Sequence, residues 1–126
     1  MMNPIRAASL ILAAGLAACS GSSLKAPTDP GVCWHLVRAN GEYRFNKLAE
    51  NQPQLEFCAA RLEDMRLRFM RLGAAGDQVV GAYQGQFIFL QREGVFTARS
   101  LETTPYLALV RTGDGRLAIP GAVRGR

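Results

Sequence analysis

The sequence has few of the residues on which many catalytic and metal sites depend. It contains one histidine, His35, and three cysteines among 126 residues. A single histidine excludes the metalloprotease sites that need two, and it excludes a Ser-His-Asp triad unless His35 itself takes part. Three cysteines are too few for a dense disulfide scaffold. No GxGxxG or phosphate-binding P-loop motif occurs, and we expect no cofactor.

Long hydrophobic runs are missing too. The longest uncharged stretch of apolar character covers residues 7–18, and as a helix these 12 residues extend only about 18 Å, well short of the ~30 Å hydrocarbon core. A permanent transmembrane helix is therefore not expected. Hydrophobic residues make up 48% of the chain and charged residues 20%, which excludes extensive disorder and predicts one small domain.

The chain is basic, with a formal net charge of +5 from 15 Lys and Arg against 10 Asp and Glu. Such an excess can attract anionic lipid, peptidoglycan or an acidic partner. Residues 73–76 (GAAG) match the GXXG loop of KH RNA-binding domains only in their letters, because they precede a predicted strand and carry no basic residue. We therefore expect no nucleic-acid partner.

The first residues have the layout of an export signal. A short cationic start that includes Arg6 leads directly into the uncharged stretch, as in the n- and h-regions of a signal peptide. The stretch ends in Leu16, Ala17, Ala18 and Cys19, followed by Ser20 and Gly21. This segment resembles the lipobox of bacterial lipoproteins, and residues 1–21 carry the whole resemblance. The alternative is an ordinary secretory signal that happens to end near a cysteine.

The lipobox resemblance implies a membrane-anchored protein of the cell envelope. It implies cleavage between Ala18 and Cys19, and acylation of the Cys19 thiol with palmitate-type chains that enter the lipid bilayer. Ser20 in place of an aspartate implies the outer membrane more than the inner one, with the domain facing the periplasm. We expect residues 1–18 to be the cleaved signal peptide and residues 19–31 to be the lipidated N-terminus and flexible linker.

Residues 32–120 are predicted to form a single domain that opens with a β-hairpin, and residues 121–126 a frayed tail. Residues 32–37 are rich in β-prone side chains, and residues 42–48 alternate aromatic with polar side chains. Asn40 and Gly41 lie between them, and this pair favours a two-residue turn because both positions tolerate positive φ.

An amphipathic helix of about 20 residues should follow the hairpin. Asn51, Gln52 and Pro53 offer a start, and Gly73 offers a stop. Between them, apolar residues recur at the three- and four-residue spacing of one helix face: Leu55, Cys58, Leu62, Met65, Phe69 and Leu72. Four arginines fall off this stripe: Arg61, Arg66, Arg68 and Arg71.

Beyond Gly73 the sequence has the pattern of short strands. Apolar runs of strand length are separated by turn residues, and strands joined by such short turns pair antiparallel. The expected strands cover residues 78–84, 87–92, 95–101, 106–112 and 116–119. The predicted fold is therefore α+β, with a hairpin, one amphipathic helix, and an antiparallel meander of four or five strands packed on the helix.

Cys33 and Cys58 are the two cysteines of the predicted domain. An export signal places them in an oxidising compartment, where such a pair normally forms a disulfide bond. Two buried free thiols are one alternative. A chemical role is another: Cys33 and His35 leave the same face of a strand and could form a thiolate dyad, or could bind zinc together with Cys58, although no fourth ligand is evident.

The sequence thus predicts a non-enzymatic binding, assembly or scaffold module, tethered to the membrane through Cys19. The alternative is an envelope enzyme or redox protein that uses Cys33 and His35. The strands carry more large apolar residues than one helix can cover, so the sheet face opposite the helix should bind an envelope partner or a second copy of the chain. Phe89 and Phe96 are the candidate partner-binding residues on that face.

Overall fold

A computed structural model of the chain describes residues 24–73 and 78–121. The expected signal peptide, the cleavage site at Ala18 and Cys19, and most of the expected tail lie outside the described residues. In chain order the elements are β1 (Cys33–Ala39), β2 (Glu42–Ala49), α2 (Leu55–Arg71), β3 (Val79–Tyr83), β4 (Gln86–Gln91), β5 (Gly94–Ala98), β6 (Tyr106–Arg111) and β7 (Leu117–Ala118).

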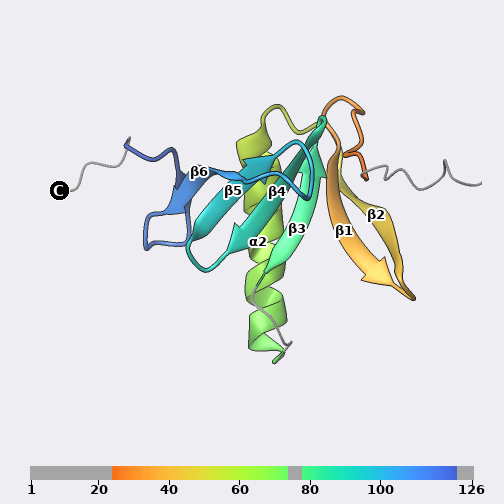
Figure 1. The fold of residues 1–126 in the computed structure, drawn as a ribbon. Helices are drawn as coiled ribbons and strands as arrows, with labels where there is room; N and C mark the ends of the chain where they lie inside the picture. Colours follow the sequence, from red (N-terminus) through yellow and green to blue (C-terminus); the bar gives the residue numbers. More distant parts are fainter. Residues whose placement is uncertain (1–23, 74–77, 122–126) are drawn as a thin grey trace, which may run out of the picture.

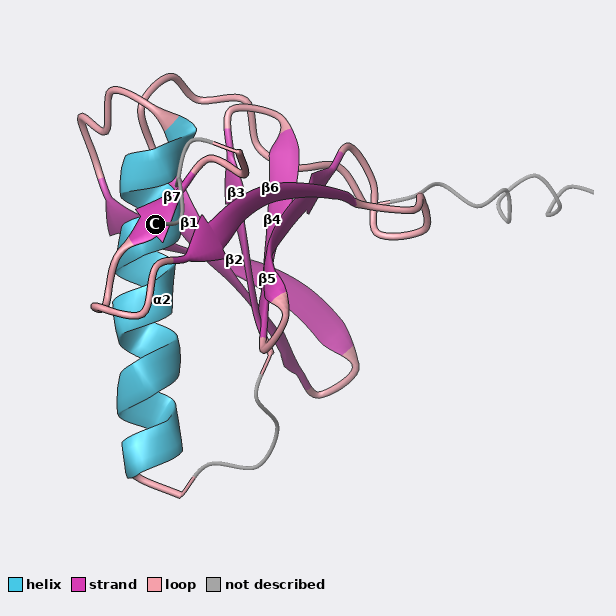
Figure 2. Ribbon diagram, turned by 90° about the vertical axis from the view of Figure 1, so that its left-hand side faces the viewer, coloured by secondary structure: helices cyan, strands magenta, loops and turns pink. Residues whose placement is uncertain are grey.

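The seven strands form one antiparallel sheet in the order β2-β1-β3-β4-β5-β6-β7. The helix α2 connects β2 to β3 and packs on one face of the sheet (Figures 1 and 2). Because β3 returns beside β1 rather than β2, the first hairpin lies at one edge of the sheet and the meander extends from it. The predicted α+β fold is confirmed.

Two tight turns set the register of the sheet. Asn40 and Gly41 have φ values of 54° and 81°, and Gln84 and Gly85 have φ values of 43° and 86°. Two successive positive φ angles give a turn whose twist matches that of the flanking strands. The first turn confirms the predicted hairpin, in which Ala39 pairs with Glu42.

The main core lies between α2 and the sheet. Its members come from the helix and from alternate positions of the strands: Cys33, Cys58, Ala59, Leu62, Val79, Tyr83, Ile88, Leu90, Val95 and Leu109. Gly81 lies directly beneath the helix, where a Cβ atom would come within 2.4 Å of Leu62 Cδ1. The missing side chain therefore allows the helix to approach the sheet closely.

A second apolar cluster covers the opposite face of the sheet. It comprises Ala26, Leu36, Ala82, Phe87, Phe89 and Ala98, with Leu24, Trp34, Phe45, Val80, Phe96 and Leu101 packed against it. The rings of Phe45 and Phe87 stack with centroids 6.2 Å apart. Residues of the chain itself thus cover much of this face, which the sequence predicted to be apolar and open to a partner.

The expected boundary between linker and domain is wrong. Ala26 is only 7% exposed within the second cluster, and Leu24 packs beside it. The Gly85 backbone N–H donates to the Pro27 carbonyl oxygen at 2.8 Å, which fixes this segment to the turn between β3 and β4. Residues 24–31 therefore belong to the domain, because their few apolar atoms fill the edge of its second core.

The helix is shorter than expected at its start. It begins at Leu55 after an extended Gln54, since Asn51 adopts a left-handed φ of 59° and belongs to the preceding loop. The predicted stripe is buried only in its first half. Cys58 and Leu62 are fully buried, whereas Phe69 is 37% exposed and, just past the end of α2, Leu72 is 82% exposed.

Candidate functional site

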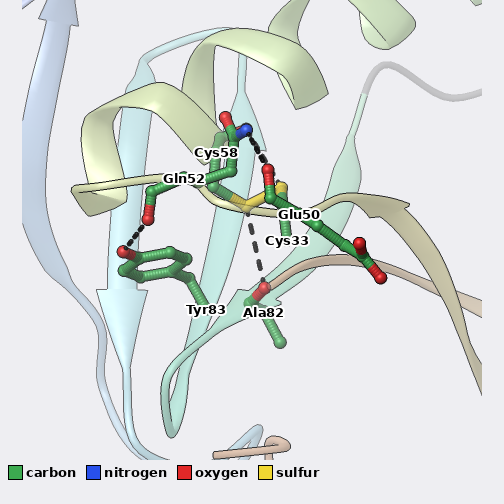
Figure 3. The surroundings of a disulfide bond; sticks show 6 residues. All are labelled: Cys33, Glu50, Gln52, Cys58, Ala82 and Tyr83. Carbon is green, nitrogen blue, oxygen red and sulfur yellow. Dashed lines mark hydrogen bonds between the residues drawn. A yellow bond between two sulfur atoms is a disulfide. The ribbon is translucent and has the colours of Figure 1, made fainter. Parts of the chain in front are cut away.

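Cys33 and Cys58 form a disulfide bond, with their Cα atoms 5.2 Å apart. Cys33 opens β1 and Cys58 lies in the first turn of α2, so the bond joins the first strand to the helix (Figure 3). Both residues are fully buried, and Cys58 Sγ lies 3.7 Å from the carbonyl oxygen of Ala82. The predicted disulfide is confirmed.

The loop before α2 closes over this disulfide. The Tyr83 hydroxyl donates to the Gln52 carbonyl oxygen at 2.6 Å, and Gln52 Nε2 donates to the Glu50 carbonyl oxygen at 2.8 Å (Figure 3). The Gln52 backbone N–H donates to the Gly31 carbonyl oxygen at 2.8 Å. These bonds hold the loop against the sulfur atoms, so the surroundings of the disulfide suit a structural bond rather than an accessible reactive one.

His35 lies two residues from Cys33 but does not form a dyad with it. Its ring contacts Phe69 near the end of the helix, with centroids 6.2 Å apart. Partial burial lowers the pKa of the His35 imidazole, because the charged form loses hydration there. With Cys33 oxidised, neither a thiolate nucleophile nor a thiolate zinc ligand is present beside the imidazole.

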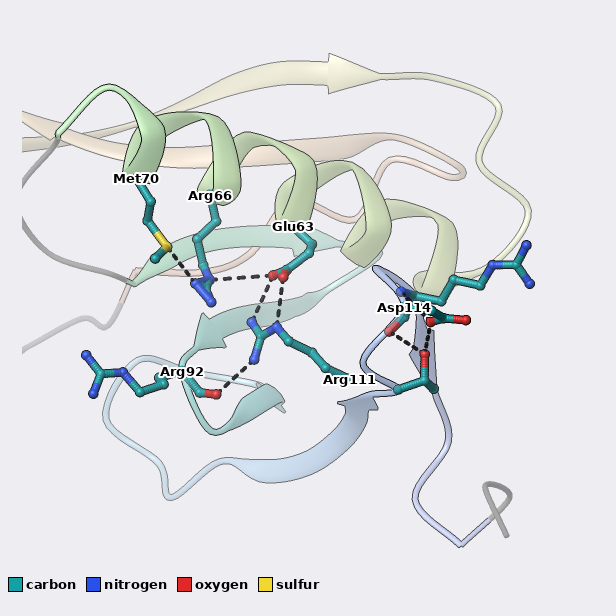
Figure 4. Close-up of polar contacts among 8 residues, drawn as sticks. Glu63, Arg66, Met70, Arg92, Arg111 and Asp114 are labelled. Carbon is teal, nitrogen blue, oxygen red and sulfur yellow. Dashed lines mark hydrogen bonds and ion pairs between the residues drawn. The ribbon is translucent and has the colours of Figure 1, made fainter. Parts of the chain in front are cut away.

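A charged cluster joins the helix to β6, and its burial was not expected from the sequence. Glu63 and Arg66 on α2 are 5% and 6% exposed. Arg111 of β6 donates to both oxygens of Glu63 in a bidentate pair, with each N–O distance 2.8 Å (Figure 4). Arg111 also donates to the Arg92 carbonyl oxygen at 3.0 Å. The hydrogen bonds that Arg111 donates to the Glu63 carboxylate raise the pKa of the Arg111 guanidinium group.

Arg66 makes the weakest polar contacts in this cluster. Its Nε atom lies 3.5 Å from Glu63 Oε1 and is buried without a hydrogen-bond partner, while its Nη1 atom lies 3.1 Å from Met70 Sδ. Arg66 falls off the predicted apolar stripe, and yet its side chain is buried. The cluster sets one carboxylate against two guanidinium groups, and it fastens the middle of α2 to the sheet (Figure 4).

An open groove of about 410 Å³ runs between the first half of α2 and the turn that leads into β7. The helix contributes one wall and the β7 turn the other: Glu56, Phe57, Ala60, Asp64, Gly115, Arg116 and Leu117. The groove combines apolar surface with charges of both signs, and Phe57 is half exposed. A groove of this composition and size can accept an amphipathic segment or a few side chains of a partner.

The turn that forms the second wall is built around Asp114. The Thr112 hydroxyl and the Arg116 backbone N–H both donate to Asp114 Oδ1, the latter at 3.1 Å. These bonds lower the pKa of the Asp114 carboxyl. These hydrogen bonds within the turn place Arg116 and Leu117 across from the helix, where they line the groove.

The candidate partner-binding residues Phe89 and Phe96 lie in the second apolar cluster. Phe89 is 9% exposed and Phe96 is partly buried against it. They pair across β4 and β5 in the sheet register. Binding at this face would therefore have to involve the rim of the cluster, and it remains a prediction.

Comparisons with known proteins identify no relative. No family model matches the chain, and no curated protein and no solved structure is significantly similar to it. In the part of the chain that the structure describes, no helix is long and apolar enough to cross a membrane. Within the same residues, no three His, Cys, Asp or Glu side chains gather as a metal site would require.

Proposed function

We propose that the chain is a lipid-anchored envelope protein whose domain serves as a non-enzymatic binding, assembly or scaffold module in the periplasm. The resemblance of residues 16–19 to a lipobox supports the anchor at Cys19. The Ser20 that follows favours the outer membrane over the inner one. The bilayer, through the acylated Cys19, is one partner, and an envelope protein or a second copy of the chain is the other.

The buried Cys33–Cys58 disulfide carries this proposal. Such bonds persist in oxidising compartments and are rare in the cytosol, so the bond supports export to the envelope. A fully enclosed bond that joins a strand to a helix has a structural role. The alternative, an enzyme or redox protein that uses Cys33 and His35, requires reduction of this bond and exposure of Cys33, which is fully buried.

The groove between α2 and β7 is the surface that we propose for the protein partner. Phe57 offers an exposed aromatic anchor, and Arg116 stands opposite the carboxylates of Glu56 and Asp64. Aromatic residues with charges at the rim are typical of protein interfaces. The groove would therefore bind an amphipathic segment that buries an apolar side chain against Phe57.

The anchor is tested with Cys19→Ser in the full chain. This substitution should abolish incorporation of labelled palmitate and release the protein from the membrane fraction, whereas Ser23→Ala should leave both unchanged. Palmitate labelling of Cys19→Ser, together with retention in the membrane fraction, would contradict the anchor. A separate titration of the isolated protein should find no reactive thiol at Cys33 or Cys58, and reactive thiols there would favour the enzymatic alternative.

The groove is tested by in-cell cross-linking from single sites. A photo-cross-linking residue in place of Phe57 should yield a discrete adduct with an envelope protein or with a second copy of the chain. The matched control is the same residue in place of Asn46, which is exposed on the edge strand β2. Equal adducts from both sites, or none from Phe57, would contradict binding at the groove.

A further inference from the structure

The end of α2 and the residue after it present an exposed surface that is both apolar and basic. We define the helix end as Arg68, Phe69, Met70, Arg71 and Leu72, all of which are exposed. Phe69, Met70 and Leu72 are 37%, 46% and 82% exposed. Figures 1 and 2 show the cause: α2 runs beyond the end of the sheet. Its last turns are therefore covered only in part, with Phe69 in contact with His35 of β1.

The charges on this part of the helix have one sign. Residues 65–72 contain three arginines and no acidic residue. Arg66 is buried in the cluster with Glu63, whereas Arg68 and Arg71 are exposed beside the apolar side chains. Large apolar residues combined with exposed arginines are the composition of helices that bind the surface of an anionic membrane. A cluster with this charge complements lipid phosphate better than it complements a second copy of itself.

The β1–β2 hairpin adds a second element of the same character. Its tip points toward the same end of the molecule as the helix end (Figures 1 and 2). Tyr43 is 45% exposed there, and the Arg38 guanidinium carbon lies 5.2 Å from the centre of its ring. Arg44 is exposed as well, with Glu42 as the acidic neighbour. Tyrosine and arginine are favoured at the level of lipid headgroups.

The length of chain before the domain limits how far the domain as a whole can stand from a bilayer. Leu24 already packs on the domain, so only five residue steps separate it from Cys19. Even when fully extended, five residues reach only about 18 Å. If Cys19 is acylated, the domain cannot stand far from the headgroups, and one of its surfaces must face them.

We propose that the helix end, together with the hairpin tip, docks the domain on anionic phospholipid headgroups. The tether argument rests on the proposed lipid anchor, whereas the charge and exposure of the helix end do not. Phe69, Met70 and Leu72 enter the headgroup boundary, and Arg68 and Arg71 pair with lipid phosphates. The groove between α2 and β7 involves the other half of the helix, so docking leaves it open toward the periplasm.

The test measures how deeply the helix end enters a bilayer. The acylated chain is reconstituted in vesicles that contain brominated phosphatidylcholine, with or without phosphatidylglycerol. The reporter is Leu72→Trp, and the signal of the wild-type chain with its native Trp34 is subtracted. The matched control reporter is Tyr106→Trp, because Tyr106 is 77% exposed and β6 lies toward the opposite end of the molecule (Figure 1).

The added tryptophan at position 72 should be quenched in vesicles with phosphatidylglycerol and not in vesicles without it. The control at position 106 should be quenched in neither. Adding Arg68→Glu and Arg71→Glu to the reporter should remove the quenching, and because both arginines are exposed the fold should survive. Equal quenching in both vesicle types, or none in either, would overturn the proposal. A cross-linked dimer at the helix end in place of quenching would identify a second copy as its occupant.

A failure of the anchor is separable from a failure of docking. Mass analysis of the isolated chain reports acylation by itself. If the chain carries no acyl groups, the proposed function fails, and the same chain is floated with the two vesicle types. Flotation with anionic vesicles alone, lost on Arg68→Glu and Arg71→Glu, would then support docking, and no flotation would overturn it.

Discussion

Glu63 is the residue on which the charged cluster of the core depends. It receives two hydrogen bonds from Arg111 and is the nearest carboxylate to the buried Arg66. A buried ion pair adds little net stability when compared with a well-packed apolar pair, but removal of one partner leaves an unpaired charge in a dry environment. Loss of the Glu63 carboxylate should therefore lower the free energy of unfolding by more than the intact cluster contributes to it.

Glu63→Gln should lower the free energy of unfolding by about 3 kcal/mol, because two guanidinium groups lose their counter-charge while the shape is kept. Urea denaturation of the purified chain measures this loss. The matched control is Glu50→Gln, which breaks the exposed pair of Glu50 with Lys47. No measurable change is expected there, since exposed pairs are screened by water. Equal effects of the two substitutions would contradict a structural role for the cluster.

His35 makes the free energy of unfolding depend on pH, and the direction of this dependence follows from the pKa of its imidazole. Burial lowers the pKa of its imidazole below the usual value of 6.5, so the unfolded chain takes up the proton first as the pH falls. Between the two pKa values the unfolded state binds more protons, and stability therefore falls as the pH drops through this window. Wild type should lose more stability than His35→Gln between about pH 7 and pH 5. Parallel denaturation profiles would contradict this.

At the scale of elements, Gly81 sets how closely the helix approaches the sheet. A Cβ atom at this position would lie 2.4 Å from Leu62 Cδ1 and 2.5 Å from the Trp34 carbonyl oxygen. The leucine side chain can rotate away, but the carbonyl belongs to the backbone of the paired strand β1. An added methyl group must therefore push α2 outward or distort the pairing of β1 with β3.

Gly81→Ala should destabilise the fold by roughly 2 kcal/mol or more, as overpacked cores do. Denaturant unfolding measures the loss. Gly85→Asn is the matched control: at the Gly85 φ of 86° asparagine adds backbone strain, though less than most residues would, and its Cβ would meet only Thr28 Cγ2, at 3.6 Å. A smaller effect of Gly85→Asn than of Gly81→Ala separates close packing from turn geometry. The reverse order would refute the packing argument.

The sequence predicts those elements whose structure depends on near neighbours in the chain. Asn40 and Gly41 specify the hairpin because their backbone conformation is local, and the helix follows from the spacing of its apolar residues. The burial of Glu63 and Arg66 could not be predicted, because it depends on Arg111, which is 48 residues from Glu63 in the chain. Leu24 belongs to a segment of linker composition, and its packing depends on aromatic residues far along the sequence.

The candidate surfaces were predicted less well than the fold for a related reason. Strand alternation correctly puts Phe89 and Phe96 on the face opposite the helix, but it cannot show that Ala26 and Leu24 return to that face. The helical stripe predicts which side of α2 is apolar, but not that the sheet covers Phe69 only in part and leaves Leu72 exposed. Exposure depends on the lengths of the packed elements, which a periodic pattern does not contain.

At the scale of the whole molecule, the two halves of the helix have different surroundings. The first half carries the disulfide and one wall of the groove, and the middle is fastened to β6 by Glu63 and Arg111. The last turns are exposed. The domain thus has one end rigidly joined to the sheet and another end free to meet a different surface, which suits a module that binds two partners at once.

The disulfide should account for much of the stability of a domain this small. It closes a loop with a sequence separation of 25 residues, which contains the whole of β2 and the start of α2. Restricting the unfolded chain in this way is worth about 3 to 4 kcal/mol in the chain-entropy estimate. The double variant Cys33→Ala, Cys58→Ala should lose that amount in denaturant unfolding, and a reducing agent should then have no further effect on it.

The wild-type chain should need denaturant for rapid reduction, because both cysteines are fully buried. Rapid reduction in native buffer, or unchanged stability without the bond, would show that the enclosed disulfide does not hold the first strand to the helix.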